Sequence, residues 1–256
     1  MSKRKRFVIS SLALSLGFVG IQFLDNPYRF LAIGILGLAT IGFFIWSLYE
    51  GLGSNATLLT LVLPTMFTLG VGIFWFLLPT SVFARLPVVI FYGIGIYVLS
   101  LTMNIFTVAT IRTIALLRAA RGVGFVLTLV TFFLVFDAIL SLKASLAVTA
   151  LGVGIVSFPL FVQGLWSASL EPKLEKEILT AGLIFSLVVG EIAAGLYFWP
   201  VTVVVGSLFY TVSVYMLLGL GQARIEGRLF AQTVKEYLVV GILVFAGMFI
   251  ATRWGS

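Results

Sequence analysis

Cysteine and histidine are both missing from this chain of 256 residues. Without cysteine there can be no disulfide, no thiolate nucleophile and no iron–sulfur ligation. Without histidine the chain lacks the most common metal ligand and general base, which excludes a Ser–His intramembrane protease. No P-loop, dinucleotide-binding fingerprint or H-E-x-x-H motif occurs either. These absences favour a protein that is not an enzyme, and they predict no cofactor and no metal site.

Charged side chains are scarce as well. They make up 10% of the residues, whereas apolar residues make up 61%, against about 25% and about 45–50% in soluble domains. So few charges cannot cover so much apolar surface in water, so we expect an integral membrane protein. The net charge of +7 does not indicate nucleic-acid binding, because the basic residues flank apolar segments, where anionic lipid headgroups attract them.

Nine apolar segments have the length of membrane-spanning helices, which need ~17–25 residues. The first, 7–24, follows four basic residues and resembles a signal peptide. However, it exceeds the ~7–15 residues of a cleaved hydrophobic region, so we expect a retained helix. The sequence predicts an all-α, polytopic transmembrane bundle, with residues 1–256 forming a single integral membrane domain, although eight or ten spans remain possible. The predicted spans are 7–24, 30–49, 56–78, 86–109, 122–142, 145–168, 178–198, 201–220 and 236–252.

The distribution of basic residues predicts the orientation. If the N-terminus is cytoplasmic, twelve of the 16 Lys and Arg residues lie on the cytoplasmic side and four lie outside. Cytoplasmic loops are enriched in basic residues, so this asymmetry predicts a cytoplasmic N-terminus and an outside C-terminus. The twelve cytoplasmic residues, which we expect to contact anionic headgroups, are Lys3, Arg4, Lys5, Arg6, Arg112, Arg118, Arg121, Lys173, Lys176, Arg224, Arg228 and Lys235.

Two acidic residues, Asp137 and Glu191, lie within predicted spans. An ionised carboxylate at the bilayer centre costs at least ~2.5–3.5 kcal/mol, so such residues face protein or water, or carry a proton. At 1.5 Å per residue, both carboxyls are about 7–10 Å from the outer edge of the membrane. If their helices touch, the pair could share a proton or hold a cation. Alternatively, Asp137 reaches the outer surface near Lys143, and Glu191 bonds a neighbouring hydroxyl.

The span that carries Glu191 also has a row of small residues four positions apart: Gly182, Ser186, Gly190 and Ala194. Small residues let the backbones of membrane helices approach closely. We therefore predict that this row is a helix-packing face and that the span is central in the bundle.

The favoured function is movement of a small solute, ion or lipid across the cell (inner or plasma) membrane, with Asp137 and Glu191 as proton or cation sites. A polar cavity that reaches Glu191 would favour it. The alternative is a scaffold or subunit that binds partner membrane proteins, for which a tightly packed interior and a small-residue or aromatic face toward lipid would be typical. A membrane-embedded enzyme ranks third, because polar groups suited to catalysis are scarce.

Overall fold

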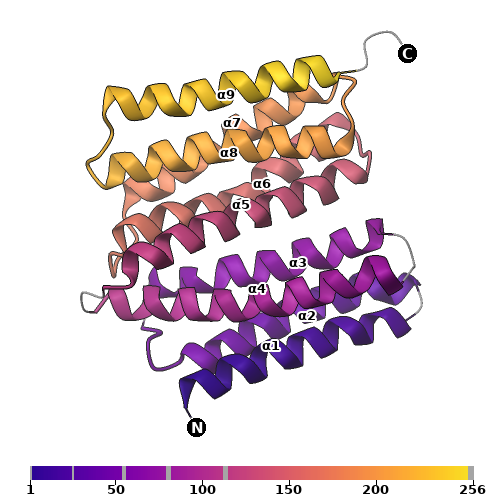
Figure 1. Cartoon of the computed structure of the whole chain (residues 1–256), viewed down its shortest axis with the longest axis vertical. Coiled ribbons are helices and arrows are strands. Elements are labelled where there is room, and N and C mark those ends of the chain that lie inside the picture. Colours follow the sequence, from indigo (N-terminus) through magenta and orange to yellow (C-terminus); the bar gives the residue numbers. More distant parts are fainter. Residues whose placement is uncertain (1, 25, 54–55, 79–81, 112–114, 253–256) are drawn as a thin grey trace. The chain divides into compact units, whose positions relative to one another are not determined.

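The computed structural model describes residues 2–24, 26–53, 56–78, 82–111 and 115–252 (Figure 1). These residues form helices and turns, and no strand occurs among them. The α-helices are α1 (Lys3–Gly20), α2 (Asn26–Leu48), α3 (Val62–Leu77), α4 (Val82–Ala109), α5 (Leu117–Ser141), α6 (Leu146–Ser169), α7 (Lys176–Leu196), α8 (Val203–Ile225) and α9 (Ala231–Ala251). Two 3₁₀ helices, η1 (Ile21–Phe23) and η2 (Ala56–Leu61), adjoin α1 and α3.

Among the described residues, eight helical segments are long and apolar enough to cross a membrane: α2, α4 to α9, and the continuous run of η2 and α3. Their outward faces carry apolar side chains that would be costly in water but suit lipid, such as Leu38 and Ile155, each 70% exposed, and Ile250, 82% exposed. The chain is thus an all-helical, multi-pass membrane protein.

The first predicted span differs most in composition from the other eight. Helix α1 begins at Lys3, four residues before the predicted start, because the basic residues 3–6 form its first turn. Its 18 residues therefore include four charges, and α1 is not among the eight apolar segments. The other predicted spans agree with the observed helices to within five residues at each end.

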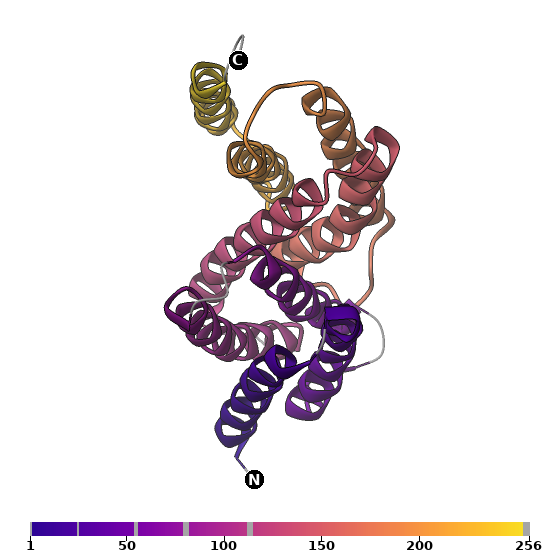
Figure 2. The same cartoon turned by 90° about the vertical axis from the view of Figure 1, so that its right-hand side faces the viewer.

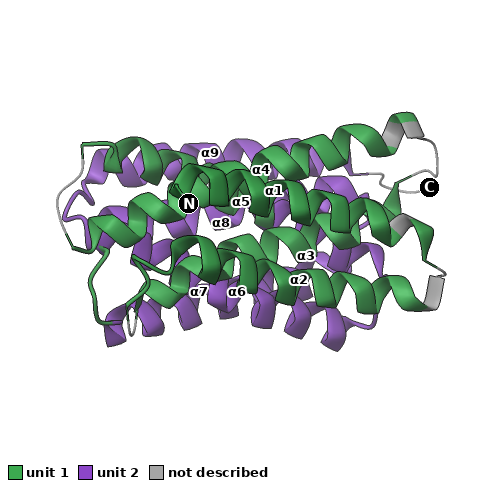
Figure 3. Cartoon of the chain, turned by 90° about the horizontal axis from the view of Figure 1, so that it is seen from below, with its two compact units in different colours: residues 1–131, 170–173 green, residues 132–169, 174–256 purple. Residues whose placement is uncertain are grey.

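Contacts between backbones divide the chain into two compact units, coloured green and purple in Figure 3. Unit 1 comprises residues 1–131 and 170–173, and unit 2 comprises residues 132–169 and 174–256. The division falls inside α5, so its first part belongs to unit 1 and its last ten residues to unit 2. The expectation of a single membrane domain stays a prediction.

Unit 1 is built around α1 to α4, in which α1 packs against both α2 and α4, and α3 against both α2 and α4. Aromatic rings fill its centre. Phe18 of α1 lies 4.9 Å from Trp75 of α3 and 5.0 Å from Tyr92 of α4, measured between ring centroids, and Phe67 stacks on Tyr92 at 6.0 Å. Gly95 leaves room for the Phe67 ring, because a Cβ there would lie 2.6 Å from it.

A chain of buried hydroxyl groups links three helices of unit 1. The Thr68 hydroxyl of α3 lies 3.0 Å from that of Thr40 on α2 and 3.1 Å from that of Tyr92 on α4. All three side chains are fully buried. In hydrocarbon such groups find no water, so they must bond to one another or to the backbone.

An acid that follows α2 pairs with two of the four basic residues in the first turn of α1. Glu50 forms ion pairs with both Lys3 and Arg6, and the guanidinium of the buried Arg6 lies over the Tyr49 ring. The hydrogen bond from Arg6 and then that from Lys3 hold the pKa of Glu50 below its usual value. Part of the charge at this end of α1 is thus compensated within unit 1.

Unit 2 is organised around the pair α6 and α7, whose backbones are in the most extensive contact of any helix pair. Helix α8 packs on both of them, and α9, yellow in Figures 1 and 2, packs chiefly on α8. The last part of α5 contributes Phe132, whose ring lies 5.1 Å from that of Phe161 on α6, and Phe136, whose ring lies 5.4 Å from that of Tyr210 on α8.

Thr68→Val tests the hydroxyl chain of unit 1. This near-isosteric change leaves Thr40 and Tyr92 without their shared partner, so we expect a loss of about 0.6–1.7 kcal/mol, the range of hydrogen bonds between membrane helices. Thermal unfolding of the purified protein in detergent measures it. The matched control is Thr65→Val, because the Thr65 hydroxyl bonds only to the carbonyl of Leu61 in its own helix. Equal losses in the two variants would contradict the role of the chain.

Candidate functional site

Asp137 lies in the last part of α5 and is buried, with 5% of its surface exposed. The hydroxyl of Ser207 on α8 lies 3.4 Å from its Oδ1 and can donate to it. That hydroxyl also donates to the carbonyl of Val203 at the shorter distance of 2.8 Å. A serine has one hydroxyl proton, so it cannot serve both acceptors fully. Asp137 is thus a buried carboxyl group with a weak hydrogen bond.

A cavity of about 270 Å³ lies at the end of unit 2 that holds the α5–α6 and α7–α8 turns. Leu140, one helical turn after Asp137, lines it, and so do Gly206 and Tyr210, which flank Ser207 in the sequence. Neither Asp137 nor Ser207 lines the cavity, but each is within one helical turn of a residue that does. Its lining includes four residues with polar side chains, namely Lys143, Thr149, Thr202 and Tyr210, together with Trp199.

Lys143 lies at the rim of this cavity because of how α5 ends. Its backbone has a φ of +46°, and its amide donates to the carbonyl of Leu140, which closes the helix in a left-handed turn. The Lys143 side chain is exposed. No ion pair with Asp137 occurs among the described residues, so the alternative in which Asp137 reaches the surface beside Lys143 does not describe this geometry.

Glu191 lies in different surroundings. Its side chain is exposed on α7 and lines an apolar groove of about 510 Å³ along α6 and α7. Asp137 is buried instead, and its carboxyl group lies beside the Ser207 hydroxyl of α8. The structure does not bring the two carboxyl groups into one site.

The row of small residues on α7 faces α6. A Cβ at Gly190 would lie 3.3 Å from the carbonyl oxygen of Ala150, and a Cβ at Gly182 would lie 2.7 Å from the Val162 side chain. From the other helix, a Cβ at Gly154 would lie 3.4 Å from the carbonyl oxygen of Ser186. These approaches explain the close α6–α7 packing. Ser186, Gly190 and Ala194 of the row also line the groove beside Glu191.

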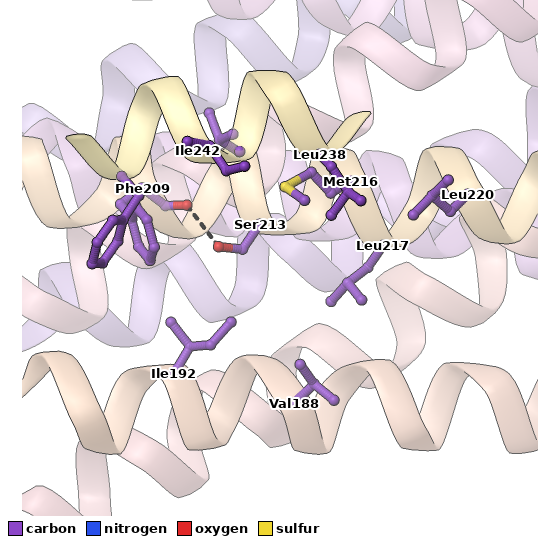
Figure 4. A pocket seen from close by; sticks show the side chains of 12 residues that line it. Val188, Ile192, Phe209, Ser213, Met216, Leu217, Leu220, Leu238 and Ile242 are labelled. Atoms are coloured by element: carbon purple, nitrogen blue, oxygen red, sulfur yellow. Dashed lines mark hydrogen bonds between the residues drawn. The ribbon is translucent and has the colours of Figure 1, made fainter. Parts of the chain in front are cut away.

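A further cavity of about 350 Å³ lies among α7, α8 and α9 (Figure 4). Val188 and Ile192 of α7 face Met216 of α8 and Ile242 of α9 across it. Its one hydroxyl, that of Ser213, donates to the carbonyl of Phe209 in the same helix. The cavity is therefore apolar and offers no group that could bind an ion.

Sequence reasoning identified Asp137 but missed Ser207 and Tyr210. Hydroxyl groups are common in membrane helices, where most bond to their own backbone, so neither residue stood out from its neighbours. Only the position of Ser207 and Tyr210 in the sequence could have pointed to them. Gly206 and Ser207 follow the Trp199–Pro200 turn by less than two helical turns, which places them at the same end of the bundle as Asp137.

The chain belongs to the family DUF5656, described as a protein of unknown function, whose model matches residues 17–251. The match includes both intramembrane carboxyl groups and all eight apolar segments, and it leaves out the basic turn of α1. No curated protein and no solved structure matches the chain.

Gly190→Leu tests the α6–α7 packing. The added side chain meets the backbone of α6, so we expect a destabilisation of about 1–3 kcal/mol, as for other overpacked sites. The matched control is Gly195→Leu in the same helix, because a Cβ at Gly195 meets nothing within 4 Å. Thermal unfolding in detergent measures both variants. If Gly190→Leu is as stable as Gly195→Leu, the helices are not in the close contact described.

Proposed function

We propose that this protein transports a small ion across the membrane and that Asp137 binds and releases the proton or cation that crosses. The observation that carries the proposal is a buried carboxyl group, weakly bonded to Ser207, within one helical turn of a residue that lines a partly polar cavity. Within membrane spans, ionisable residues are rare and mark ion pathways and proton relays.

The hydrogen bonds of Ser207 favour a protonated Asp137. The Ser207 hydroxyl donates to the Val203 carbonyl at 2.8 Å, and its oxygen can then accept a bond from a carboxylic acid. A neutral Asp137 would donate to Ser207 across the observed 3.4 Å, and no charge would be buried. If Asp137 is ionised, it needs a cation or water in that place, because its only described bond is weak.

The cavity offers Asp137 a route to one end of the membrane if the residues between them move. The cavity wall includes Leu140 and Gly206, so a small rearrangement of these residues connects Asp137 to the aqueous side. The polar rim at Lys143 and Thr202 suits entry of water. The positive charge of Lys143 limits the local concentration of cations, so entry of a proton through bound water is the simplest route.

The scaffold hypothesis has one observation of its own. The groove along α6 and α7 is apolar, lies on the surface of unit 2 and carries the exposed Glu191. A polar residue of a partner helix could bond to Glu191 there. In that case Glu191→Gln would weaken assembly and leave ion movement unchanged. Asp137→Asn would leave assembly unchanged and lower ion movement.

Asp137→Asn tests the transport proposal. The protein is reconstituted in liposomes that contain a pH-sensitive dye, and proton entry is followed under a potassium diffusion potential, with and without a gradient of Na⁺. We expect the variant to lower the flux to that of empty liposomes, because an amide cannot exchange a proton. The control is Glu191→Gln, an equally conservative change at the other intramembrane acid, which should keep wild-type flux. A wild-type flux equal to that of empty liposomes, or unchanged by Asp137→Asn, would refute the proposal.

We also propose nine spans, with α1 as the first, a cytoplasmic N-terminus and an outside C-terminus, in the plasma or inner membrane. Packing supports the membrane location of α1: its Ser11 hydroxyl donates to the Gly93 carbonyl of α4 at 2.6 Å, and Phe18 contacts α3 and α4. The Arg6–Glu50 pair offsets the charge of Arg6, which is the basic residue next to the apolar part of α1.

Labelling of the two tails tests this topology. The chain has no cysteine, so Ser2→Cys and Ser256→Cys each supply a single reactive group. In intact cells we expect a membrane-impermeant maleimide to label the Ser256→Cys variant alone, and both variants after the cells are lysed. Labelling of both, or of neither, in intact cells would place the tails on one side and give an even number of spans.

A further inference from the structure

Two cavities of unit 2 lie one after the other along the seam between α7 and α8. The first is the apolar cavity of about 350 Å³ in Figure 4. The second, of about 630 Å³, is lined by Glu177 near the start of α7 and by Arg224 near the end of α8, and we call it the charged cavity. Each has the size of a ligand pocket, roughly 300–1,000 Å³.

The residues of α7 that line the two cavities share one face of the helix. Glu177, Ala181 and Ile184 line the charged cavity, and Val188 and Ile192 line the apolar one. Each is three or four residues from the next, which is the spacing of a single stripe along a helix. The two cavities are therefore successive sections of one groove, the α7–α8 groove.

Helix α8 forms the opposite wall of this groove. Arg224 lines the charged cavity, and Leu220, one helical turn earlier, lines the apolar one, which continues along α8 to Phe209. Arg224 and Phe209 are 15 residues apart, as are Glu177 and Ile192, so each wall is about 22 Å long at 1.5 Å per residue. One leaflet supplies about half of the ~30 Å hydrocarbon core. The groove is thus long enough to hold a lipid chain.

The α7–α8 groove is open to the surrounding lipid. Ile184 of α7 and Ile242 of α9 line it and are exposed, whereas Leu217 and Leu220 of α8 are half-buried deeper in it. A lipid chain can therefore enter from the side without passing through the interior of unit 2.

An ion pair lies at one end of this groove. Nη2 of Arg224 is 3.3 Å from Oε1 of Glu177, and the two side chains are 73% and 63% exposed. Arg224 is in the last turn of α8 and Glu177 in the first turn of α7, which is the level of the membrane at which headgroups lie. So exposed a pair contributes little to stability, so its two charges are available to a ligand.

We infer that the α7–α8 groove binds one phospholipid whose headgroup carries both a phosphate and a primary ammonium group, as phosphatidylethanolamine does. The Arg224 guanidinium donates hydrogen bonds to the phosphate, the ammonium donates to the Glu177 carboxylate, and one acyl chain lies in the apolar cavity. An anionic headgroup would be repelled by Glu177, and a quaternary amine has no N–H group to donate to it. The inference does not depend on the proposed ion transport.

Photocrosslinking tests the inference with the whole chain. The protein is reconstituted in phosphatidylcholine vesicles that contain a trace of phosphatidylethanolamine with a diazirine at the end of one acyl chain, and mass spectrometry identifies the labelled residues. We expect labels to concentrate in the apolar cavity, around Ile192 and Phe209. Added phosphatidylethanolamine should displace the probe about three- to fivefold better than added phosphatidylglycerol, the selectivity that one exposed ion pair supplies.

Two variants test the headgroup contacts, and both positions are exposed, so neither change should impair folding. Glu177→Gln should abolish the preference for phosphatidylethanolamine over phosphatidylglycerol, because it removes the group that bonds the ammonium. Arg224→Gln should lower labelling of the apolar cavity, because it removes the partner of the phosphate. The matched control is Arg228→Gln at the same end of unit 2, since Arg228 pairs with Glu226 and lines neither cavity. It should keep the wild-type preference.

Labels spread evenly over the lipid-facing helices would overturn the inference. Equal displacement by the two lipids in the wild-type protein would do the same, and so would a preference that Glu177→Gln leaves unchanged. Asp137→Asn should label as the wild-type protein does. A failed flux experiment therefore leaves the lipid site standing, and a failed labelling experiment leaves the transport proposal standing.

Discussion

Hydrocarbon as the surrounding medium constrains every polar group in this protein, because a group without a partner there has no water to bond instead. The buried hydroxyls of Thr40, Thr68 and Tyr92 satisfy one another across three helices. The basic turn of α1 is partly compensated by Glu50. Most other hydroxyls return to the carbonyl of their own preceding turn. Against this background, Asp137 has only a weak bond to Ser207, and the buried Oγ atoms of Ser10 and Ser157 have no partner among the described residues.

The helices could be predicted from the sequence because one property decides them. A run of apolar residues of bilayer length must form a helix, and its ends are set by charges, prolines and glycines that no other force overrides. The segment 178–198 illustrates this, since α7 begins and ends two residues before the predicted positions. Helix α1 is the element whose observed start differs from the prediction for a reason that the local sequence does not show. Its helix extends through residues 3–6 into the basic leader, because Glu50, 44 positions after Arg6, supplies a counter-charge that local pattern cannot reveal.

The surroundings of the two intramembrane acids could not be predicted in the same way. Both were expected at similar depth, and depth follows from counting residues along a helix. Which neighbour each one faces depends on the rotation of the helix and on the order of helices in the bundle, and neither is encoded in a single span. The row from Gly182 to Ala194 indicated one face of α7, and that face contacts α6. Glu191 follows Gly190 by one residue, so it is turned away from that contact onto the groove.

The seam of α6 and α8 connects these observations to a mechanism. At one end it has Thr149, Tyr210 and the cavity, and at the other the amide of Gln222 donates to the Gly164 carbonyl at 2.8 Å. Between them, Leu160, Val214 and Leu218 close the seam. Leu218 closes it only because position 164 is a glycine, which leaves space for its methyl groups. Under the proposed transport function, a separation of α6 from α8 at these three aliphatic side chains would change the side from which Asp137 is reached. Pro159, which removes a backbone hydrogen bond from α6 close to Leu160, lowers the cost of the bending that this needs.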